Sequence, residues 1–373
     1  MKHLAAICLL LILAVFLTAC GGGVTNLQTP DNAPLDTPTA SNQPATIPAV
    51  TLPGTFQEYA LPQSDSGLMR PAIDHEGRIW FGEMGHNYLA VFDPRTDTFQ
   101  QMVPPRGQSG VMGVQVAPDD TIWFAEQYAN YIGHYFPATG HYQLYPLPDI
   151  TTPDPSDSSK ILTLPCAPND IVLDANGNVW FAELNSDAIG KLDPRTGALQ
   201  QYHISNPPTV QKLDPYGITI DPQGFIWFTE ASTDHVGRLD PNTGKFTFFT
   251  MPGAVLPLME IASDPHGTIW ITSFSNGLLL SLNPHTGKFT PYYAPFTGNN
   301  AGGVYGLTIS PNGEIWVTIP ALNTIAQLDV AANHYVYYSI PTPSSLPLGL
   351  VMGANHTIWF TEAESSKIGM LKP

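Results

Sequence analysis

The sequence contains little cysteine and little charge. Only three of its 373 residues are cysteines, and charged residues make up 12% of the chain. Cys8 and Cys20 both lie in the N-terminal apolar segment, so Cys166 has no partner and a disulfide framework is excluded. The 14 basic residues face 31 acidic ones, which gives a net charge of −17. An acidic chain without a basic cluster does not fit a protein that binds nucleic acid or anionic lipid.

Several enzyme motifs are also missing. The chain has no His-Glu-x-x-His zinc motif, no Gly-x-Ser-x-Gly nucleophile turn and no Cys-x-x-Cys pair. Turn residues are plentiful instead, with 37 prolines and 32 glycines beside many aromatic and β-branched residues. This composition predicts a turn-rich all-β protein and not a disordered one.

Seven tryptophans mark seven copies of one repeat. They lie 43 to 57 residues apart, each in a short apolar run: Trp80, Trp123, Trp180, Trp227, Trp270, Trp316 and Trp359. The copy at 216–252 contains four β-patterned runs separated by turns such as Asp221-Pro222-Gln223-Gly224, where proline presets φ and glycine accepts a positive φ. Four-stranded units of this length are typical of β-propeller blades. The sequence therefore predicts an all-β, seven-bladed β-propeller of four-stranded antiparallel blades, with the tryptophans packed between blades.

The two ends of the repeat region predict how the ring closes. The second strands are predicted at 78–83, 121–126, 178–183, 225–230, 268–273, 314–319 and 357–362, and the last unit has a third strand at 367–371 but no fourth. Residues 55–62 resemble the fourth strands of other units, so we expect this N-terminal strand to complete the last blade and remove the open edge. The one long interval between tryptophans holds a Pro/Ser/Asp-rich insert, residues 149–160, which we predict to be a loop.

Residues 1–20 are predicted to be an export signal. Lys2 and His3 precede a 16-residue apolar run, shorter than the roughly 20 residues that span a bilayer. The run ends in Leu17-Thr18-Ala19-Cys20-Gly21, which resembles the bacterial lipoprotein box and implies that Cys20 is lipidated and anchored to the extracytoplasmic face of the cell membrane. An ordinary signal with an incidental cysteine is the alternative. Residues 21–54, rich in Pro and Thr, are predicted to be a disordered tether before the propeller at 55–373.

The predicted binding region is the mouth of the central channel, where first strands begin and second strands end. Alignment of the units places one residue of each blade there: Met69, Met112, Asn169, Tyr216, Met259, Tyr305 and Leu348. The following position is glycine in four blades and is occupied by Arg70, Asp170 and Glu260 in the other three. A charged residue in place of a repeat glycine is either a ligand contact or part of a local ion pair, and the sequence leaves both open.

Glutamates end five of the second strands: Glu83, Glu126, Glu183, Glu230 and Glu362. We interpret them as a repeated structural device, for example accepting backbone N–H groups of a neighbouring blade. Glu362 differs because Glu364 lies two residues away, and paired carboxylates would suit a hard divalent cation. Only His86 and His235 among the assigned histidines fall on the mouth side. Cys166 is interpreted as a buried small hydrophobe, with a reactive thiol as the alternative.

The repeat motif Trp-Phe-Thr-Glu followed by Ile/Val-Gly-x-Leu resembles the streptogramin lyases, the virginiamycin B lyase family. It is clearest at Trp227-Phe228-Thr229-Glu230 with Val236-Gly237-Arg238-Leu239, and in residues 359–371. The resemblance covers about residues 55–373. It implies a seven-bladed propeller whose relatives open cyclic depsipeptide antibiotics by Mg²⁺-assisted elimination at the ester bond.

The residues that carry the family's chemistry are not matched here. The resemblance implies a tyrosine where this chain has Met69, a Pro-His pair at Val304-Tyr305, and Glu-Pro-His, with the general base, at Leu346-Pro347-Leu348; at most one acid, Glu362 or Glu364, survives. We therefore favour a non-catalytic, monomeric propeller that binds an apolar or mixed small molecule, or a peptide, at its Met- and Tyr-lined mouth. The alternative is an enzyme, either a divergent Mg²⁺-dependent lyase or a metal-dependent lactonase-like hydrolase that uses Glu362 and Glu364.

Overall fold

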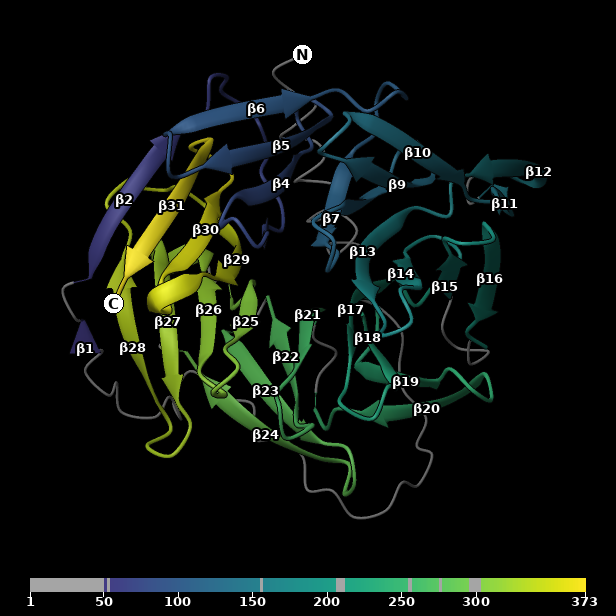
Figure 1. The fold of residues 1–373 in the computed structure, drawn as a ribbon. Helices are drawn as coiled ribbons and strands as arrows, with labels where there is room; N and C mark the ends of the chain where they lie inside the picture. The colour runs from purple at the N-terminus through teal and green to yellow at the C-terminus, as the bar shows by residue number, and fades with distance from the viewer. Residues whose placement is uncertain are drawn as a thin grey trace.

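The computed structural model describes residues 50–51, 54–154, 157–205, 212–253, 257–274, 277–294 and 303–373. Seven antiparallel sheets stand around a central axis, so the predicted seven-bladed β-propeller is confirmed (Figure 1). The only helical elements among these residues are two short 3-10 turns, η1 (Pro320–Leu322) and η2 (Ala354–His356). Residues 1–20, with Cys20, lie outside the described residues, as does most of the predicted tether.

Each blade runs outward from its first strand at the axis to its fourth strand at the rim. Blade 1 consists of β3 (Ala72–Ile73), β4 (Ile79–Glu83), β5 (Tyr88–Asp93) and β6 (Thr98–Met102), and blade 2 of β7 (Val111–Val116), β8 (Ile122–Glu126), β9 (Tyr131–Phe136) and β10 (His141–Pro146). Blade 3 consists of β13 (Pro168–Leu173), β14 (Val179–Glu183), β15 (Ala188–Asp193) and β16 (Ala198–His203). Blade 4 consists of β17 (Pro215–Ile220), β18 (Ile226–Glu230), β19 (His235–Asp240) and β20 (Lys245–Thr250). Blade 5 consists of β21 (Leu258–Ser263), β22 (Ile269–Ser273), β23 (Leu278–Asn283) and β24 (Lys288–Tyr293). Blade 6 consists of β25 (Leu307–Ile309), β26 (Ile315–Ile319), β27 (Thr324–Asp329) and β28 (His334–Ser339). Blade 7 consists of β29 (Pro347–Met352), β30 (Ile358–Glu362), β31 (Lys367–Lys372) and β2 (Thr55–Ala60). Every second strand ends where predicted and begins one residue later.

The N-terminal strand closes the ring as predicted. β2 pairs antiparallel with β31, from Thr55 opposite Lys372 to Ala60 opposite Lys367. The structure also shows a strand before β2 that the sequence did not indicate. β1 (Val50–Thr51), inside the segment assigned to the tether, pairs in parallel with β28 at the outer edge of blade 6. The N-terminal part of the propeller is therefore held by two neighbouring blades.

The tryptophans pack between blades, as the repeat predicted. Trp180 shares a buried cluster with Phe228 of the next blade, and the other six tryptophans make equivalent contacts around the ring, including Trp359 with Phe81 across the closure. In blades 1, 3, 4 and 5 the aspartate of the first turn serves this packing, because its carboxylate accepts the indole N–H, for example from Trp227 to Asp221 at 2.7 Å. These turns therefore satisfy a buried donor that would otherwise cost free energy.

The glycine of the repeat motif has a packing reason. Phe228 lies directly across from Gly237 on the adjacent strand, and a Cβ on Gly237 would come within 2.0 Å of the Phe228 ring. The same Phe–Gly pair recurs at 124 and 133, 181 and 190, and 360 and 369. Blade 5 instead pairs Ile271 with Leu280. Blade 1 has Phe81 opposite Ala90, so the residue facing the ring is glycine or alanine in all five blades with phenylalanine here. A smaller side chain on the second strand permits a larger partner on the third.

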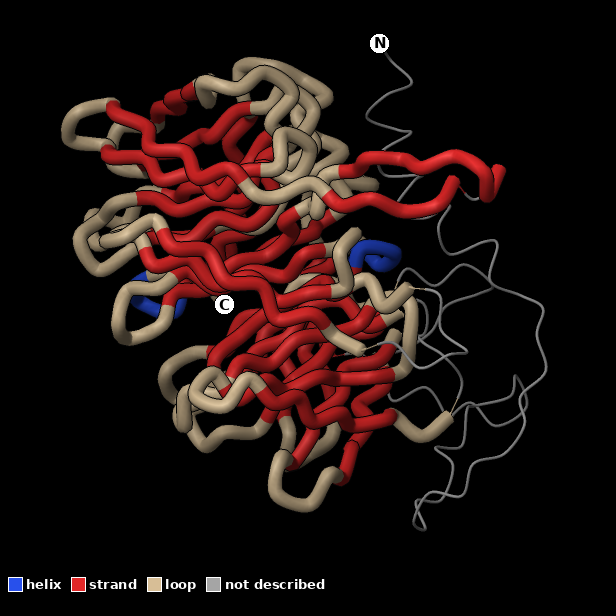
Figure 2. Tube along the Cα trace, turned by 90° about the vertical axis from the view of Figure 1, so that its right-hand side faces the viewer, coloured by secondary structure: helices blue, strands red, loops and turns tan. Residues whose placement is uncertain are grey.

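The insert between blades 2 and 3 is a hairpin, so its prediction as a loop was wrong. β11 (Ile150–Asp154) pairs with β12 (Asp157–Leu164), and the hairpin stands out from the ring in Figure 2. The Pro/Ser/Asp-rich residues extend into both strands, where β11 ends at Pro153-Asp154 and β12 begins at Asp157-Ser158-Ser159. The alternating β-branched and apolar residues on both sides of the hairpin tip favour strands.

Candidate functional site

The structure brings six of the seven predicted mouth residues into one buried cluster: Met69, Met112, Tyr216, Met259, Tyr305 and Leu348. The Tyr216 and Tyr305 hydroxyl oxygens lie 2.6 Å apart across the channel. The seventh residue, Asn169, donates its side-chain amide to the Tyr216 carbonyl at 2.9 Å and accepts from Gln127 at 3.1 Å. A β-bulge at the start of the first strand in five blades redirects these side chains toward the axis.

Directly beside this cluster, the three charged residues meet at the axis. Arg70 of blade 1 binds Glu260 of blade 5 with two hydrogen bonds, from Nη2 to Oε1 at 2.6 Å and from Nε to Oε2 at 2.9 Å. Its Nε also lies 3.7 Å from Asp170 Oδ1 of blade 3. The sequence left a ligand contact and a local ion pair open, and the structure shows an ion triad that joins three blades. We call Arg70, Asp170 and Glu260 the axial triad.

The glycines at the same position in the other blades let the first strands of neighbouring blades approach closely. A Cβ on Gly217 would come within 2.6 Å of the Met259 carbonyl oxygen, and one on Gly306 within 2.1 Å of the Leu348 oxygen. Large side chains at this level therefore come only from blades 1, 3 and 5. Burial raises the pKa of Asp170 and of Glu260, and the nearby Arg70 charge opposes that rise. Arg70 Nη1 is buried and finds no hydrogen-bond partner among the described residues.

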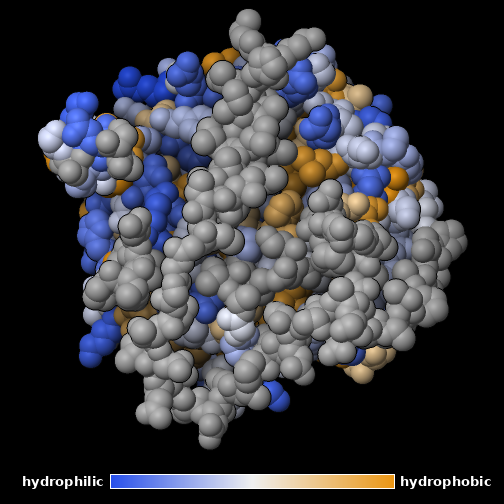
Figure 3. Space-filling model, turned by 180° about the vertical axis from the view of Figure 1, so that it is seen from behind, coloured by the Kyte–Doolittle hydropathy of each residue, from blue (hydrophilic) through white to orange (hydrophobic). Residues whose placement is uncertain are grey.

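A half-buried apolar rim surrounds the cluster, and the sequence reasoning missed it. Met84, Leu184, Phe274 and Leu346 pack against the mouth residues while remaining partly exposed. Figure 3 views the face from which the β11–β12 hairpin projects, and hydrophobic side chains are visible toward the middle of that face. The signal was present in the repeat, because Met84, Leu184 and Phe274 each directly follow the last residue of a second strand. We call Met84, Leu184, Phe274 and Leu346 the apolar rim.

The repeated glutamates point into the blades and away from the axis. Their carboxylates accept hydrogen bonds from side chains of their own blade, as Glu83 does from Gln101 at 2.8 and 3.0 Å and Glu183 from Ser186 and Gln201. The predicted role as a structural device fits this geometry, although side chains and not the backbone N–H groups of a neighbouring blade donate these bonds. Glu126 is the exception, because neither of its buried oxygens has a hydrogen-bond partner in the described part of the chain.

Replacing Glu126 by glutamine should stabilise the protein, and more so at high pH. Burial raises the pKa of Glu126 to about 7, so the folded chain binds a proton more tightly than the unfolded chain. This tighter proton binding stabilises the folded wild-type chain fully below the unfolded pKa of about 4.5, and the stabilisation is lost as the pH rises through 7. Thermal unfolding at pH 5 and pH 8 gives the difference in free energy of unfolding between Glu126→Gln and wild type. This difference should be larger at pH 8 than at pH 5 by about 1–3 kcal/mol. Glu83→Gln, whose partner is Gln101, serves as the control and should gain less.

The structure places Glu362 and Glu364 in different surroundings. Glu362 is buried, accepts a hydrogen bond from Ser365 at 3.0 Å, and has a pKa raised to about 7 by burial and by nearby Glu58. Glu364 is exposed. Across the described residues, no group of three or more His, Cys, Asp or Glu side chains is placed to hold a metal ion. The metal site at Glu362 and Glu364 stays a prediction.

Cys166 and the mouth-side histidines take local structural roles. Cys166 is fully buried, its thiol lies 3.0 Å from Asn130 Oδ1, and burial raises its pKa, which matches the interpretation as a small buried residue. His86 Nε2 lies 2.7 Å from the Ser64 carbonyl oxygen. His235 lies 3.4 Å from Glu230, which raises its pKa. Neither histidine is part of the axial triad or the apolar rim.

Part of the sequence and the fold as a whole resemble those of known proteins. No helix in the described ranges is long and apolar enough to cross a membrane. Residues 149–296 match the model of the virginiamycin B lyase family. A comparison with curated proteins finds no match.

Solved structures agree over most of the chain. A streptogramin B lyase structure matches with a TM-score of 0.74 and 28% identity, over 86% of this chain and 97% of that one. A catalytically inactive histidine-to-alanine virginiamycin B lyase from Staphylococcus aureus with quinupristin matches with a TM-score of 0.73 and 24% identity, over 86% of this chain and 100% of that one. The extracellular domain of a hybrid two-component system from B. thetaiotaomicron shares the fold, with a TM-score of 0.64 and 19% identity, over 86% of this chain and 42% of that one. The chain is thus a streptogramin lyase-like seven-bladed β-propeller.

Proposed function

We propose that this chain is a non-catalytic binding propeller, anchored through lipidated Cys20 on the extracytoplasmic side of a bacterial membrane. It acts as a monomer and takes a small amphipathic molecule or a peptide at the channel mouth. The observation that carries the proposal is the axial triad. Because Arg70 holds Glu260 with two hydrogen bonds and lies close to Asp170, the carboxylates at the axis already have a cationic partner. They are poorly placed to act as a free base.

The apolar rim and the axial triad offer complementary contacts to such a ligand. Partly exposed Met84, Leu184, Phe274 and Leu346 gain by losing contact with water. Met84 is also flexible and adapts to irregular ligand shapes. Below them, buried Arg70 Nη1 has an unused N–H that would donate to a ligand carbonyl oxygen. An apolar body with one oriented polar contact is the usual chemistry of a small-molecule site.

The positions where lyase chemistry is expected carry no base. Met69, Tyr305 and Leu348 occupy them, and Leu346 stands where the resemblance implies a glutamate. A proton abstraction without a positioned base loses roughly 10²- to 10⁴-fold in rate. The family match over residues 149–296 favours the alternative, a divergent Mg²⁺-dependent lyase or a lactonase-like hydrolase that would use Glu362 and Glu364.

The test uses quinupristin, the compound in the structure of the S. aureus relative. The full chain, in detergent, is incubated with quinupristin with and without Mg²⁺, linear product is measured by mass spectrometry, and binding by calorimetry. We expect binding, no linear product, and at least tenfold weaker binding in Leu184→Asp. Exposed Val103→Asp is the matched control and should bind as wild type does.

Two results would contradict the proposal. A linear product that requires Mg²⁺ and disappears in Glu362→Gln would establish the lyase alternative. Neither binding nor product, with both variants folded as judged by circular dichroism, would remove cyclic depsipeptides as ligands of the mouth.

A further inference from the structure

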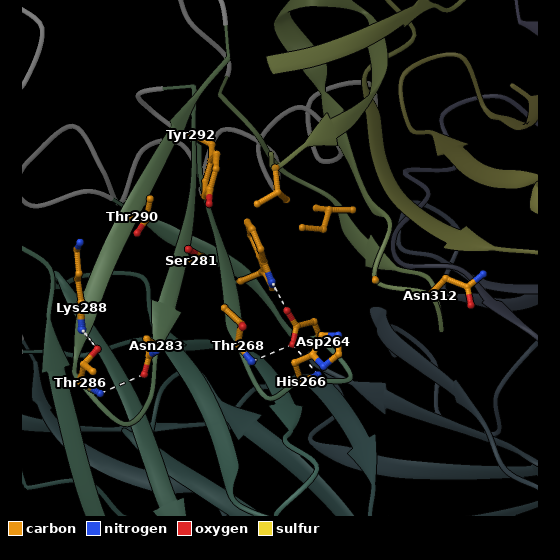
Figure 4. Close-up of a pocket in the computed structure, with 14 residues that line it drawn as sticks. Asp264, His266, Thr268, Ser281, Asn283, Thr286, Lys288, Thr290, Tyr292 and Asn312 are labelled. Carbon is orange, nitrogen blue, oxygen red and sulfur yellow. Dashed lines mark hydrogen bonds between the residues drawn. The ribbon is translucent and has the colours of Figure 1, made fainter. Parts of the chain in front are cut away.

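A cleft of about 580 Å³ opens between blades 5 and 6. Its walls include the first turn of blade 5 with Asp264 and Thr268, the third turn with Asn283, and the first turn of blade 6 with Asn312 (Figure 4). These turns follow the ends of first and third strands, so they lie at the end of the ring opposite the mouth. The volume falls in the range of small-molecule sites, about 300–1,000 Å³.

The cleft exists because blade 5 lacks a large side chain that other blades have. In every blade the tryptophan faces one residue of the third strand, and these residues are Val91, His134, Lys191, Arg238, Ser281, Gln327 and Met370. Arg238 lies over the rings of Trp227 and Phe249, at 5.5 and 5.7 Å. Ser281, the smallest of the seven, faces Trp270 in blade 5. On its other side, Ser281 lies opposite Thr290 of the fourth strand. No long side chain therefore fills the space in front of Trp270.

The lining is rich in groups that both donate and accept hydrogen bonds. Thr268, Ser281 and Thr290 supply hydroxyls, and Asn312 supplies an amide. Asn283 contributes its side-chain NH₂, because its Oδ1 already accepts the backbone N–H groups of His285 and Thr286. In Figure 4 the Tyr292 side chain lies beside the cleft with its hydroxyl directed toward Ser281. The rings of Trp270 and Tyr292, 5.3 Å apart, give an aromatic wall.

Charge contributes little to this lining. The Asp264 carboxylate is already engaged by the backbone N–H groups of His266 and Thr268, both at 2.9 Å, and by Trp270 at 3.1 Å. Lys288 adds one ammonium group at the exposed edge. An apolar ligand would leave the amides and hydroxyls without partners, and a small anion would face a strongly acidic chain. A neutral ligand with many hydroxyls and an apolar ring face matches both the polar groups and the aromatic wall.

We propose that the cleft between blades 5 and 6 is a saccharide-binding site for one or two sugar rings. It is independent of the mouth and accepts its ligand while the mouth is free or occupied. Asn283 and Asn312 hold hydroxyls from opposite walls, and Trp270 with Tyr292 contacts the ring face.

The experiment tests three neutral disaccharides, cellobiose, N,N′-diacetylchitobiose and galactobiose, against the full chain by saturation-transfer NMR, with affinities from calorimetry. We expect at least one to bind. Ser281→Arg recreates the arrangement of Arg238 in blade 4, fills the cleft, and should weaken binding at least tenfold. Ser281→Ala leaves the space open and should stay within threefold of wild type.

Exposed Asn312→Ala supplies a variant that does not disturb the core, and it should lower the affinity about tenfold. The mouth variant Leu184→Asp should bind the disaccharide normally, which separates this site from the one proposed at the mouth. Failure of all three disaccharides to bind wild type, or undiminished binding by folded Ser281→Arg, would overturn the proposal.

Discussion

Replacing Arg70 by methionine should lower the free energy of unfolding by about 3–5 kcal/mol at pH 8, because it leaves two buried carboxylates without their cation. Within the described ranges Arg70 is the only cationic partner of both carboxylates, and Asp170 and Glu260 are each less than a tenth exposed. Asp170 also accepts hydrogen bonds from the backbone N–H groups of Ile171 and Ile218, at 2.9 and 3.3 Å. Lowering the pH to 5 should reduce the loss, since the unpaired carboxyl groups then take up protons. Urea unfolding followed by tryptophan fluorescence measures both values.

Two further variants test the reason for that loss. Arg70→Met combined with Glu260→Met removes one of the uncompensated charges and should recover part of the stability. Arg95→Met breaks an ion pair with Asp93 and Glu76 in which the Arg95 side chain is 55% exposed, and it should unfold close to wild type. Equal stability of Arg70→Met and wild type at pH 8 would show that the axial triad does not hold the blades together.

Replacing Gly237 by leucine should destabilise the protein by about 1–3 kcal/mol or more, through overpacking against Phe228. A Cβ alone would approach the Phe228 ring to 2.0 Å, and that ring is itself packed in a buried cluster with Trp180 and Ile218. Thermal unfolding measures the change. Gly244→Ala provides a control in an open turn, although its positive φ of 70° adds a backbone cost of its own.

The chain itself contains the compensating change. Blade 5 has Ile271 and Leu280 where blade 4 has Phe228 and Gly237. Phe228→Ile together with Gly237→Leu should therefore be more stable than Gly237→Leu alone, with a favourable coupling energy of at least about 1 kcal/mol. Additive effects of the two substitutions would mean that the Phe–Gly contact is not the cause of the conserved spacing within the repeat.

The sequence was sufficient for features that recur in every blade. Period-two patterns, turn residues and one tryptophan per unit gave the number of blades, the second strands and the interblade role of Trp227 and its equivalents. The closing strand β2 was predictable because residues 55–62 resemble fourth strands elsewhere. The position of Tyr216 and its equivalents near the axis followed from the same alignment.

Features without a repeat were not predictable in this way. Nothing local indicates that Arg70 pairs with Glu260, 190 residues away, because that contact depends on which blades face each other across the axis. The apolar rim was missed because its residues vary from Met to Phe and share only their place after a strand. The cleft at Ser281 arises from a small residue, and a small residue shows its importance only once the neighbours that surround it are known.

The closing strand has a consequence for the order of folding. β2 is near the start of the propeller, whereas its partner β31 is the last strand of blade 7 in sequence order, with Thr55 opposite Lys372. A polypeptide made from its N-terminus therefore carries an unpaired, partly apolar strand until β31 has been made, and the closure has very high contact order. Blades 1 to 6 assemble from contacts nearby in sequence, but the ring gains its last sheet only when both ends meet. A chain that stops early keeps an exposed strand edge, which is a template for aggregation.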